Sequence, residues 1–429
     1  MLTQADNELI CRVGPGTPMG DVMRRYWVPA LLSEELQEPD GVPVRVRLLG
    51  ENLIAFRETQ GGIGLVANAC PHRGASMFFG RNEESGLRCV YHGWKFDVEG
   101  NCVDMPNEPA ESNFKHKIRI AAYPCYEKAG IVWAYLGPKD DMPEPPDYEW
   151  MRLDSRHLGM TKTFEDCNYL QGIEGGVDSS HSSFLHRNLA SSDPTLGRGS
   201  YRARSTAPRL EVMYTDYGYT YASLRFLKEE NLNYVRCYQF VMPFQQMRAG
   251  YVGIANHPTS MSRPAVQGHL WVPSDDYTHN IYNLIYAADG SEITDEEFSH
   301  ELYMAGRGPN DYFPGTYKLK KNKANDWLVD REVQRTINYT GIIGVNTQDM
   351  AVQETMGGIY DRTKEHLGSA DSAVIATRRL LLKAVRDVQA GKAPAGSQGE
   401  ANNVRPVEDT IPVDVPWADH FQPGLVAKV

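Results

Sequence analysis

Two short pairs of cysteine and histidine lie in the first quarter of the chain. The first pair is Cys70 and His72, the second is Cys89 and His92, and sixteen residues separate His72 from Cys89. Thiolates and imidazoles bind zinc and iron–sulfur clusters. A zinc finger usually pairs Cys with Cys and His with His, whereas each half here contributes one of each. The pattern therefore favours a [2Fe–2S] cluster with nitrogen ligands on one iron, and a structural zinc ribbon is the alternative.

The residues around these pairs resemble the Rieske [2Fe–2S] motif, C-x-H-x16-C-x-x-H, with Pro71, Arg73-Gly74 and the segment 91–94 in the positions that the family fills. Rieske proteins of respiratory complexes carry two further Cys, which form a disulfide beside the cluster. Ala75 and Tyr91 occupy the matching positions, so this bridge cannot form here. Because fewer groups then stabilise the reduced cluster, we expect a low-potential centre of the kind found in soluble oxygenase systems.

A second set of ligand-type residues consists of Asp178, His181 and His186. Two His five residues apart do not share one face of a regular helix, so the helix must end or bulge between them if both bind one ion. Gly175-Gly176 and Ser179-Ser180 are compatible with such a break. The spacing alone is a weak signal, since most such histidines are ordinary surface or core residues. An electron-transfer cluster upstream strengthens it, because two His and one carboxylate bind iron in non-haem Fe(II) oxygenases.

The arrangement resembles the catalytic domain of Rieske non-haem iron ring-hydroxylating oxygenases, in which an Asp precedes the two His by three and eight residues. The third ligand in that family comes from a later stretch, Q/E-D-x-x-x-x-E, which residues 348–354 resemble. We therefore assign Asp349 as the third iron ligand, with Glu354 as second choice and Asp361 as a distant third. The alternative for Asp349 is a carboxylate that stabilises a helix N-terminus.

The resemblance also implies a role for Asp178. In the family, the Asp at this position hydrogen-bonds an iron-ligand His and a cluster-ligand His of a neighbouring subunit. His92 or His72 of one subunit would then meet Asp178 of the next, which implies a homo-oligomer, either a trimer or a hexamer of two stacked trimers. The alternative is a carboxylate that only fixes the orientation of a liganding histidine.

The overall pattern is most similar to the phthalate-dioxygenase branch, and the segment 357–367 with Asp371 is shared with it. The resemblance implies an aromatic carboxylate substrate and a flavin and [2Fe–2S] reductase that uses NADH. A buried carboxylate requires a fixed cation, preferably arginine. Four arginines in or beside predicted strands are candidates, and two of them are favoured because they lie at strand edges. The favoured residues are Arg209 and Arg248, the others are Arg225 and Arg236, and Ser179 and Ser180 are further candidates for substrate contact.

Composition narrows the function classes. The net charge of −11 argues against nucleic acid and against an anionic membrane surface. Seven scattered Cys, two of them assigned to the cluster, do not form a disulfide framework. The N-terminus lacks the basic start and apolar run of a signal peptide, and no apolar stretch is long enough to span a bilayer. We therefore expect a cytoplasmic protein without a membrane or nucleic-acid partner.

The 429 residues exceed what one core usually serves. We expect an α+β fold with a small antiparallel β Rieske domain and a larger catalytic domain, whose antiparallel sheet is flanked by helices in a START or helix-grip arrangement. The expected parts are a helical segment (1–25), the Rieske domain (26–140), the catalytic domain (141–395) and a tail (396–429). Strands are expected at 44–49, 53–57, 64–67, 94–97, 123–126, 131–136, 210–214, 219–227, 233–242, 251–256, 267–272 and 281–287, and helices within 161–174 and 326–337 and over 371–389.

The combined interpretation is the oxygenase component of a multicomponent dioxygenase, which uses O₂ and NADH-derived electrons for cis-dihydroxylation of an aromatic carboxylate of the phthalate or benzoate class. A monooxygenase or O-demethylase built from the same parts is the nearest alternative. An electron carrier with an inert second domain is a third possibility. His181, His186 and Asp349 argue against a carrier, because a carrier needs no open iron site.

Overall fold

The computed structural model describes residues 2–109, 111–190, 192–193, 198–254 and 262–427. The chain forms two compact units. The smaller unit comprises Val13–Pro145 with Pro273–Asp275, and the larger comprises Met1–Arg12, Pro146–Val272 and Asp276–Val429. Both units contain antiparallel sheets, and the larger one adds helices, which confirms the α+β fold class. The expected boundaries at residues 25, 140 and 395 stay predictions.

The smaller unit consists of three antiparallel sheets. The first contains β1 (Trp27–Leu32), β9 (Cys125–Lys128) and β10 (Ile131–Tyr135), and the second contains β2 (Val44–Leu48), β3 (Glu51–Arg57) and β4 (Ile63–Ala67). The third contains β5 (Arg81–Asn82), β6 (Leu87–Arg88), β7 (Lys95–Phe96) and β8 (Cys102–Asp104), and the helix α2 (Pro18–Met23) precedes β1. Strand β1 is not among the expected strands, and it is held in place by its antiparallel pairing with β10.

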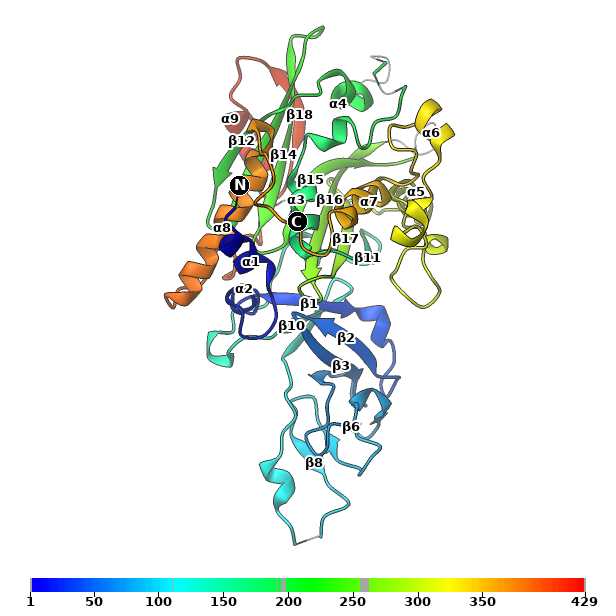
Figure 1. The fold of residues 1–429 in the computed structure, drawn as a ribbon, viewed down its shortest axis with the longest axis vertical. Helices are drawn as coiled ribbons and strands as arrows, with labels where there is room; N and C mark the ends of the chain where they lie inside the picture. Colours follow the sequence, from blue (N-terminus) through cyan, green and yellow to red (C-terminus); the bar gives the residue numbers. More distant parts are fainter. Residues whose placement is uncertain (1, 110, 191, 194–197, 255–261, 428–429) are drawn as a thin grey trace. The chain divides into compact units, whose positions relative to one another are not determined.

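The larger unit is organised around an eight-stranded antiparallel sheet (Figure 1). The strand order is β11-β17-β16-β15-β14-β13-β12, and β18 also pairs with β14. The strands are β11 (Leu158–Glu165), β12 (Arg209–Tyr214), β13 (Gly218–Leu227), β14 (Leu232–Val241), β15 (Gln245–Val252), β16 (Arg263–Pro273), β17 (His279–Ala287) and β18 (Glu408–Pro412). Strand β18 belongs to the tail and pairs with Leu232–Arg236 of β14, which the sequence did not predict.

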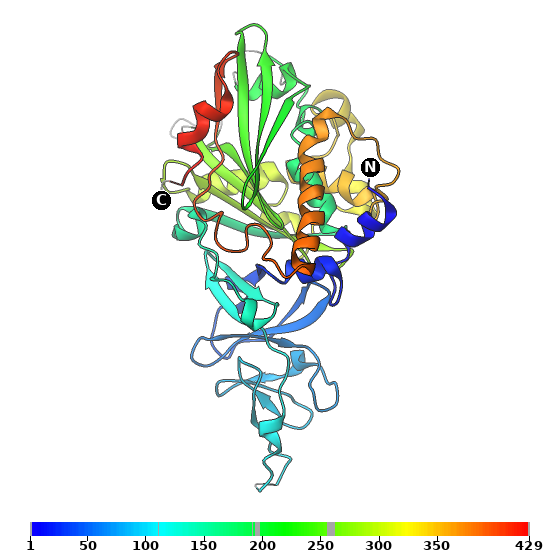
Figure 2. The same ribbon diagram turned by 90° about the vertical axis from the view of Figure 1, so that its left-hand side faces the viewer.

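Helices lie over both faces of this sheet. The helices are α1 (Gln4–Cys11), α3 (Tyr169–Val177), α4 (Tyr201–Arg204), α5 (Asp295–Ala305), α6 (Arg331–Thr336), α7 (Val345–Thr355), α8 (Ser372–Gln389) and α9 (Trp417–Phe421). Figure 2 shows α8 running beside the strands, and the Tyr219 hydroxyl of β13 bonds Thr377 of α8 at 2.7 Å. On the other face, Trp417 and Phe421 of α9 pack on Val235 and Cys237.

Two expected elements are displaced. The expected strand 251–256 is wrong, because the strand is β15 and ends at Val252; residues 255 and 256 lie outside the described residues. The first residues of β15, Gln245 and Gln246, are polar although they are buried, so the sequence did not indicate that the strand begins there. The expected helical stretch 161–174 begins as strand β11, and α3 starts only at Tyr169.

A buried ion network fixes α3 against α8 and the segment before α8. Glu174 of α3 binds the guanidinium of Arg362 at 2.8 Å and that of Arg378 at 2.6 Å, and Arg378 also pairs with Glu365. Arg362 and Arg378 are 0 % and 4 % exposed. The network anchors the C-terminal turn of α3, from which the predicted iron ligands follow.

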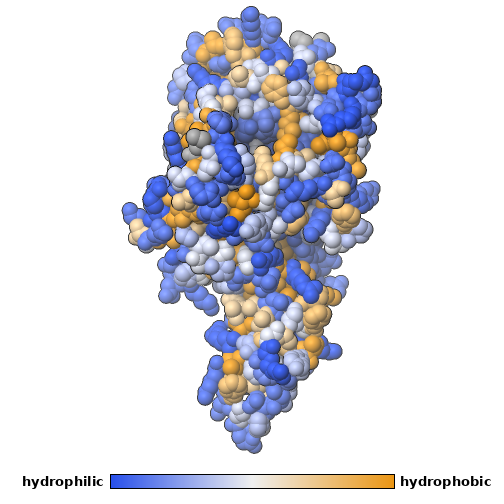
Figure 3. All heavy atoms as spheres, viewed as in Figure 1, coloured by the Kyte–Doolittle hydropathy of each residue, from blue (hydrophilic) through white to orange (hydrophobic). Residues whose placement is uncertain are grey.

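The surface of the face seen in Figure 3 mixes hydrophilic and hydrophobic residues. Among the helices of the described ranges, not one combines the length and the apolar character that crossing a bilayer requires.

Candidate active site

The end of α3 places Asp178 and His181. The helix finishes at Val177, Asp178 is its C-cap, and a short 3₁₀ turn follows over His181–Ser183. This is the break that the spacing of His181 and His186 requires. Asp349 comes from the middle of α7, and α3 packs against α7.

The three side chains expected to bind iron come together. The Nε2 atoms of His181 and His186 are 3.1 Å apart. Oδ1 of Asp349 lies 3.6 Å from Nε2 of His181 and 3.2 Å from Nε2 of His186. Two imidazole nitrogens and one carboxylate oxygen therefore face a common point, as a facial set of metal ligands does.

Neighbouring polar groups orient both imidazoles. Nδ1 of His186 lies 2.8 Å from Oε1 of Gln348, whose amide nitrogen donates to the Ile342 carbonyl. Nδ1 of His181 lies 3.5 Å from Oδ2 of Asp178. Each Nδ1 therefore faces an acceptor, so each Nε2 keeps its lone pair for a metal. Gln348 fills the first position of the stretch Q/E-D-x-x-x-x-E, but sequence reasoning gave its side chain no role.

Asp178 is held as a charged acceptor. Its Oδ1 accepts hydrogen bonds from the backbone N–H and the hydroxyl of Ser180, both at 2.7 Å. Burial raises the pKa of Asp178, but hydrogen bonding and charge interaction with His181 and Ser180 outweigh burial and lower it below its usual value. Asp178 thus remains ionised beside the imidazole that it orients.

Glu354 and Asp361, the lower-ranked ligand candidates, lie elsewhere. Oε1 of Glu354 accepts the backbone N–H of Asp166, and burial raises the pKa of Glu354 to about 7. Asp361 pairs at the surface with Lys364 at 2.9 Å. Neither belongs to the set formed by His181 and His186.

A cavity of about 320 Å³ opens beside this set. One wall is a face of the sheet, because alternate residues of four neighbouring strands line it. They are Tyr234, Arg236 and Tyr238 of β14, Arg248 and Gly250 of β15, Gln267, His269 and Trp271 of β16, and Ile281 and Asn283 of β17. The rest of the lining comes mainly from α3, α5, α7 and the loop after α3, and it includes Asp178 and Ser179.

The four candidate arginines have different surroundings in the structure. Arg209 does not line the cavity: β12 is the edge strand, and the side chain, 71 % exposed, pairs with Glu211 at 3.0 Å. This corrects the expectation that it binds substrate. Arg225 is buried and donates to Ser183 and to the Ser179 carbonyl, so it braces the loop that carries His181. Arg236 lines the cavity but bonds the Ala249 carbonyl at 2.7 Å.

Arg248 was expected at a strand edge, but it lies on an inner strand of the sheet. It lies on β15 between β14 and β16 and lines the cavity. Within the part of the chain that the structure describes, its guanidinium forms no hydrogen bond or ion pair. Burial, with Arg236 nearby, lowers the pKa of Arg248 to about 10, so a bound anion would stabilise its charged form. Ser179 is 4 % exposed, and its hydroxyl donates to Ser223 at 2.8 Å.

The smaller unit presents its Cys and His pairs on two equivalent loops. The Cys70 N–H donates to Ala75 and the Cys89 N–H to Trp94, both at 2.8 Å. Gly74 and Gly93 each donate back to the cysteine four residues earlier, with φ of +77° and +81°. Each cysteine is 2 % exposed, and the imidazoles of His72 and His92 meet with centroids 4.3 Å apart.

Comparison with known proteins decides the family. Residues 26–124 match the Rieske [2Fe-2S] domain, and residues 134–421 match the domain described as LigXa C-terminal domain like. The phthalate 4,5-dioxygenase oxygenase subunit of Pseudomonas putida is 38 % identical over 98 % of this chain and 95 % of the relative. The chain belongs to the Rieske non-haem iron oxygenases.

One further relative and one solved structure are similar to this oxygenase in sequence and in fold, respectively. The 3-chlorobenzoate-3,4-dioxygenase oxygenase subunit of Comamonas testosteroni is 38 % identical over 92 % of each chain. The crystal structure of dicamba monooxygenase bound to dicamba shares the fold, with a TM-score of 0.60 and 18 % identity over 86 % of this chain and 99 % of that one. The phthalate and 3-chlorobenzoate relatives confirm the predicted phthalate-dioxygenase-like branch.

Membership confirms that the protein is an enzyme and confirms its two predicted cofactors, a Rieske cluster and a mononuclear iron. The residues present fit both. Two buried thiols and two adjoining imidazoles on paired loops suit a cluster with nitrogen ligands on one iron. As an oxygenase subunit it works with a reductase and as an oligomer, in line with its relatives.

Proposed function

We propose that this oxygenase cis-dihydroxylates an aromatic carboxylate of the phthalate or benzoate class. The observation that carries the proposal is a cavity whose lining includes both the His181, His186 and Asp349 set and Arg248. Among the described residues the Arg248 guanidinium has no hydrogen-bond or ion-pair partner. A pocket of about 320 Å³ is within the range of small-molecule sites. The names of the relatives, which act on phthalate and 3-chlorobenzoate, support the substrate class.

We assign the mononuclear iron to His181, His186 and Asp349. The separations of 3.1–3.6 Å between their ligand atoms suit a metal bound at about 2.1 Å from each. Burial raises the pKa of Asp349, but the neighbouring His186 and His181 outweigh burial and lower it, so it is an anionic ligand. When bound, the iron supplies the activation of O₂.

We assign the Rieske cluster to Cys70, His72, Cys89 and His92. The two thiols lie in a hydrophobic core of the smaller unit, with Met77, Leu87, Trp94 and Phe96. The His72 ring stacks on Trp94 with centroids 4.3 Å apart, which fixes its plane. The burial of sulfur and the outer position of the imidazoles are what a Rieske centre requires.

Within the cavity, Arg248 orients the substrate. Its guanidinium holds the carboxylate in a fixed direction, which leaves the ring beside the liganding set. The wall that carries Ser179 is kept in place by the Ser179–Ser223 hydrogen bond and by the Ser179–Tyr238 contact at 3.2 Å. Ser179 therefore shapes the wall and contacts the substrate from it.

Electrons come from a flavin and [2Fe–2S] reductase that uses NADH, and Asp178 is the residue through which they reach the iron site. Asp178 qualifies because it is ionised, lines the cavity and lies beside His181. The pairing of Asp178 with a cluster-ligand histidine of a second copy accounts for a trimer or a hexamer. The protein works in the cytoplasm.

A substrate panel with isotopic oxygen tests this function. Purified oxygenase, a phthalate-type reductase and NADH are incubated with the three phthalate isomers and with substituted benzoates under ¹⁸O₂. We expect oxygen uptake and a product that carries two labelled hydroxyls for at least one aromatic acid, and no coupled uptake with the matched methyl esters. One labelled atom, or release of formaldehyde from a methoxy substrate, would make the enzyme a monooxygenase or demethylase.

A further inference from the structure

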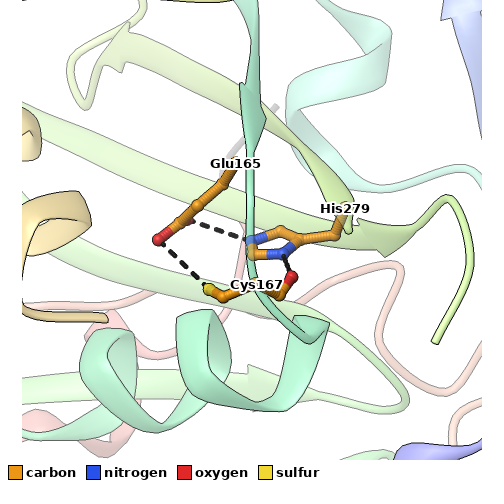
Figure 4. Close-up of side chains that lie close together, drawn as sticks. All are labelled: Glu165, Cys167 and His279. Atoms are coloured by element: carbon orange, nitrogen blue, oxygen red, sulfur yellow. Dashed lines mark hydrogen bonds and ion pairs between the residues drawn. The ribbon is translucent and has the colours of Figure 1, made fainter. Parts of the chain in front are cut away.

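A second group of ligand-type side chains lies in the larger unit, apart from the set assigned to iron. Glu165 ends strand β11, Cys167 follows it, and His279 begins strand β17. The two strands are neighbours, and Glu165 is the register partner of His279. Figure 4 shows the three side chains pointing toward one another. All three residues are 0 % exposed.

Their spacing matches a tetrahedral metal site. Nε2 of His279 lies 3.1 Å from Oε2 of Glu165, and Sγ of Cys167 lies 3.6 Å from Oε1 of Glu165. The three ligand atoms all lie within 4.8 Å of one another. Zinc bonds of about 2.0–2.3 Å place tetrahedral ligand atoms roughly 3.3–3.6 Å apart. The two separations of 3.1 and 3.6 Å fall within the range of 3.1–3.6 Å found in the set assigned to iron.

The directions of the donor atoms support the same conclusion. Nε2 of His279 and Oε2 of Glu165 lie within ion-pair distance of each other, and among the described residues neither atom has a hydrogen-bond partner. A metal ion would give both of these buried atoms a partner. Nδ1 of His279 lies 2.8 Å from the Cys167 carbonyl, which places the proton on Nδ1 and leaves the Nε2 lone pair for a metal.

Charge and surroundings also suit a divalent cation. A carboxylate and a thiolate together balance a charge of +2, so the occupied site would be neutral in this buried position. Helix α3 closes one side tightly, because a Cβ atom at Gly172 would lie 2.8 Å from Nε2 of His279. Glu165 also lines the catalytic cavity, which gives an ion and a water ligand a route to the site.

We propose that Glu165, Cys167 and His279 form a third metal site, which binds one Zn²⁺. One sulfur, one nitrogen and one oxygen are ligands that zinc accepts in tetrahedral geometry, and a water molecule from the cavity takes the fourth position. The site ties the end of β11 to the start of β17 directly before α3, the helix that leads to Asp178 and His181.

Zinc content and zinc X-ray absorption test the proposal without using activity. The full-length oxygenase with its iron and cluster is dialysed against zinc sulfate and separated from free zinc by gel filtration. We expect about one zinc per chain, with one sulfur neighbour at about 2.3 Å and the other neighbours nitrogen or oxygen. Two sulfur neighbours would place zinc in the cluster site, and none would place it with His181 and His186. Either result, or the absence of zinc, overturns the proposal.

Two cysteine variants provide a matched comparison. Cys167→Ser is expected to lose the sulfur neighbour, whereas Cys237→Ser should keep it, since Cys237 is equally buried but lies on β14. A sulfur neighbour retained in Cys167→Ser would refute the assignment. If Cys167→Ser does not fold, Glu165→Gln replaces it and should reduce the zinc content at least tenfold, while unchanged content would also refute it.

Discussion

Nδ1 of His186 lies 2.8 Å from the side-chain oxygen of Gln348. The contact fixes the plane of the imidazole and directs Nε2 toward Asp349, the residue that follows Gln348 on α7. One turn of one helix thus supplies both an assigned iron ligand and the group that orients another.

Removing the Gln348 amide is expected to weaken iron binding. In Gln348→Leu the imidazole of His186 loses its acceptor, so we expect mononuclear iron affinity to fall by about 10- to 100-fold. Chelator competition measures this affinity, and the spectrum of the reduced cluster should not change. Val352→Ala, at a position 40 % exposed on the same helix, is the control and should bind iron normally.

Asp178→Asn should separate metal binding from electron transfer. The amide keeps the size of the carboxylate but loses the charge that faces His181. We expect both metals to be retained and turnover to fall at least 100-fold, because the cluster is reduced but not reoxidised by substrate and O₂. Stopped-flow absorbance of the cluster gives the reoxidation rate. Turnover at the wild-type rate would contradict the role assigned to Asp178.

Arg248 and Arg209 form a matched pair for substrate binding. Arg248→Met is expected to raise the apparent KM for the aromatic acid about 30- to 150-fold, equivalent to about 2–3 kcal/mol for a charged hydrogen bond. Arg209→Ala should leave KM unchanged within about twofold, since its exposed side chain pairs with Glu211 at the surface. Equal effects of the two substitutions would show that the carboxylate is bound elsewhere.

The two cluster loops allow a second matched pair of substitutions, one at Gly74 and one at Gly93. Gly93 and Gly74 both have positive φ, but a Cβ at Gly93 would lie 2.6 Å from Cγ of Pro106, whereas a Cβ at Gly74 meets nothing within 4 Å. Gly74→Ala should therefore cost only about 1 kcal/mol of backbone strain and keep its cluster. Gly93→Ala should contain less than half the normal amount of cluster, measured as iron and acid-labile sulfide.

Acidification should break the ion pairs between Glu174 of α3 and its two arginines and so destabilise the larger unit. Burial raises the pKa of Glu174, but Arg362 and Arg378 outweigh burial and lower it. The stabilisation of the folded state by Glu174 is thus complete above the unfolded-state pKa, which is near 4.3. It is lost as the pH falls through the lower pKa of the folded state. Glu174→Gln should destabilise the larger unit by about 3 kcal/mol at pH 7, measured by urea unfolding, and the loss should shrink below pH 4.

An exposed acidic residue provides the control for this measurement. Glu332 pairs with Arg335 at the surface, where its side chain is 65 % exposed. Glu332→Gln should therefore change stability by less than about 1 kcal/mol at any pH. A loss as large as that of Glu174→Gln would mean that burial of the α3 network contributes little.

Local patterns were sufficient for the residues that lie near one another in the sequence. The spacing of Cys70 with His72 indicated metal binding by itself, because both lie on one loop. The spacing of His181 with His186 was a weak signal, which the cluster motif upstream strengthened. Asp349 is remote in the chain and was found only through the family resemblance. Glu165, Cys167 and His279 were not recognised, since the pairing of β11 with β17 brings His279 to the others.

The choice between arginines shows what the sequence could not supply. Arg209 and Arg248 looked equivalent, each being a cation near a strand edge. Strand order decides between them: β12 lies at the end of the sheet, whereas β15 lies inside it with one face toward the cavity. The order of strands follows from long-range pairing, which a single sequence does not display. Gln348 fills the Q/E position of the family stretch, but its contact with His186, 162 residues away in the chain, follows only from the fold.

Strand β18 has a consequence for how the polypeptide is made. It pairs with Leu232–Arg236 of β14. Glu408 of β18 forms an ion pair with Arg236 and accepts a hydrogen bond from the Tyr234 hydroxyl. During synthesis the backbone groups of Leu232–Arg236 lack their partner strand β18 until residue 412 has left the ribosome exit tunnel. The nascent chain therefore exposes an unpaired strand edge through much of its translation. Binding by a chaperone during that time would protect it from aggregation.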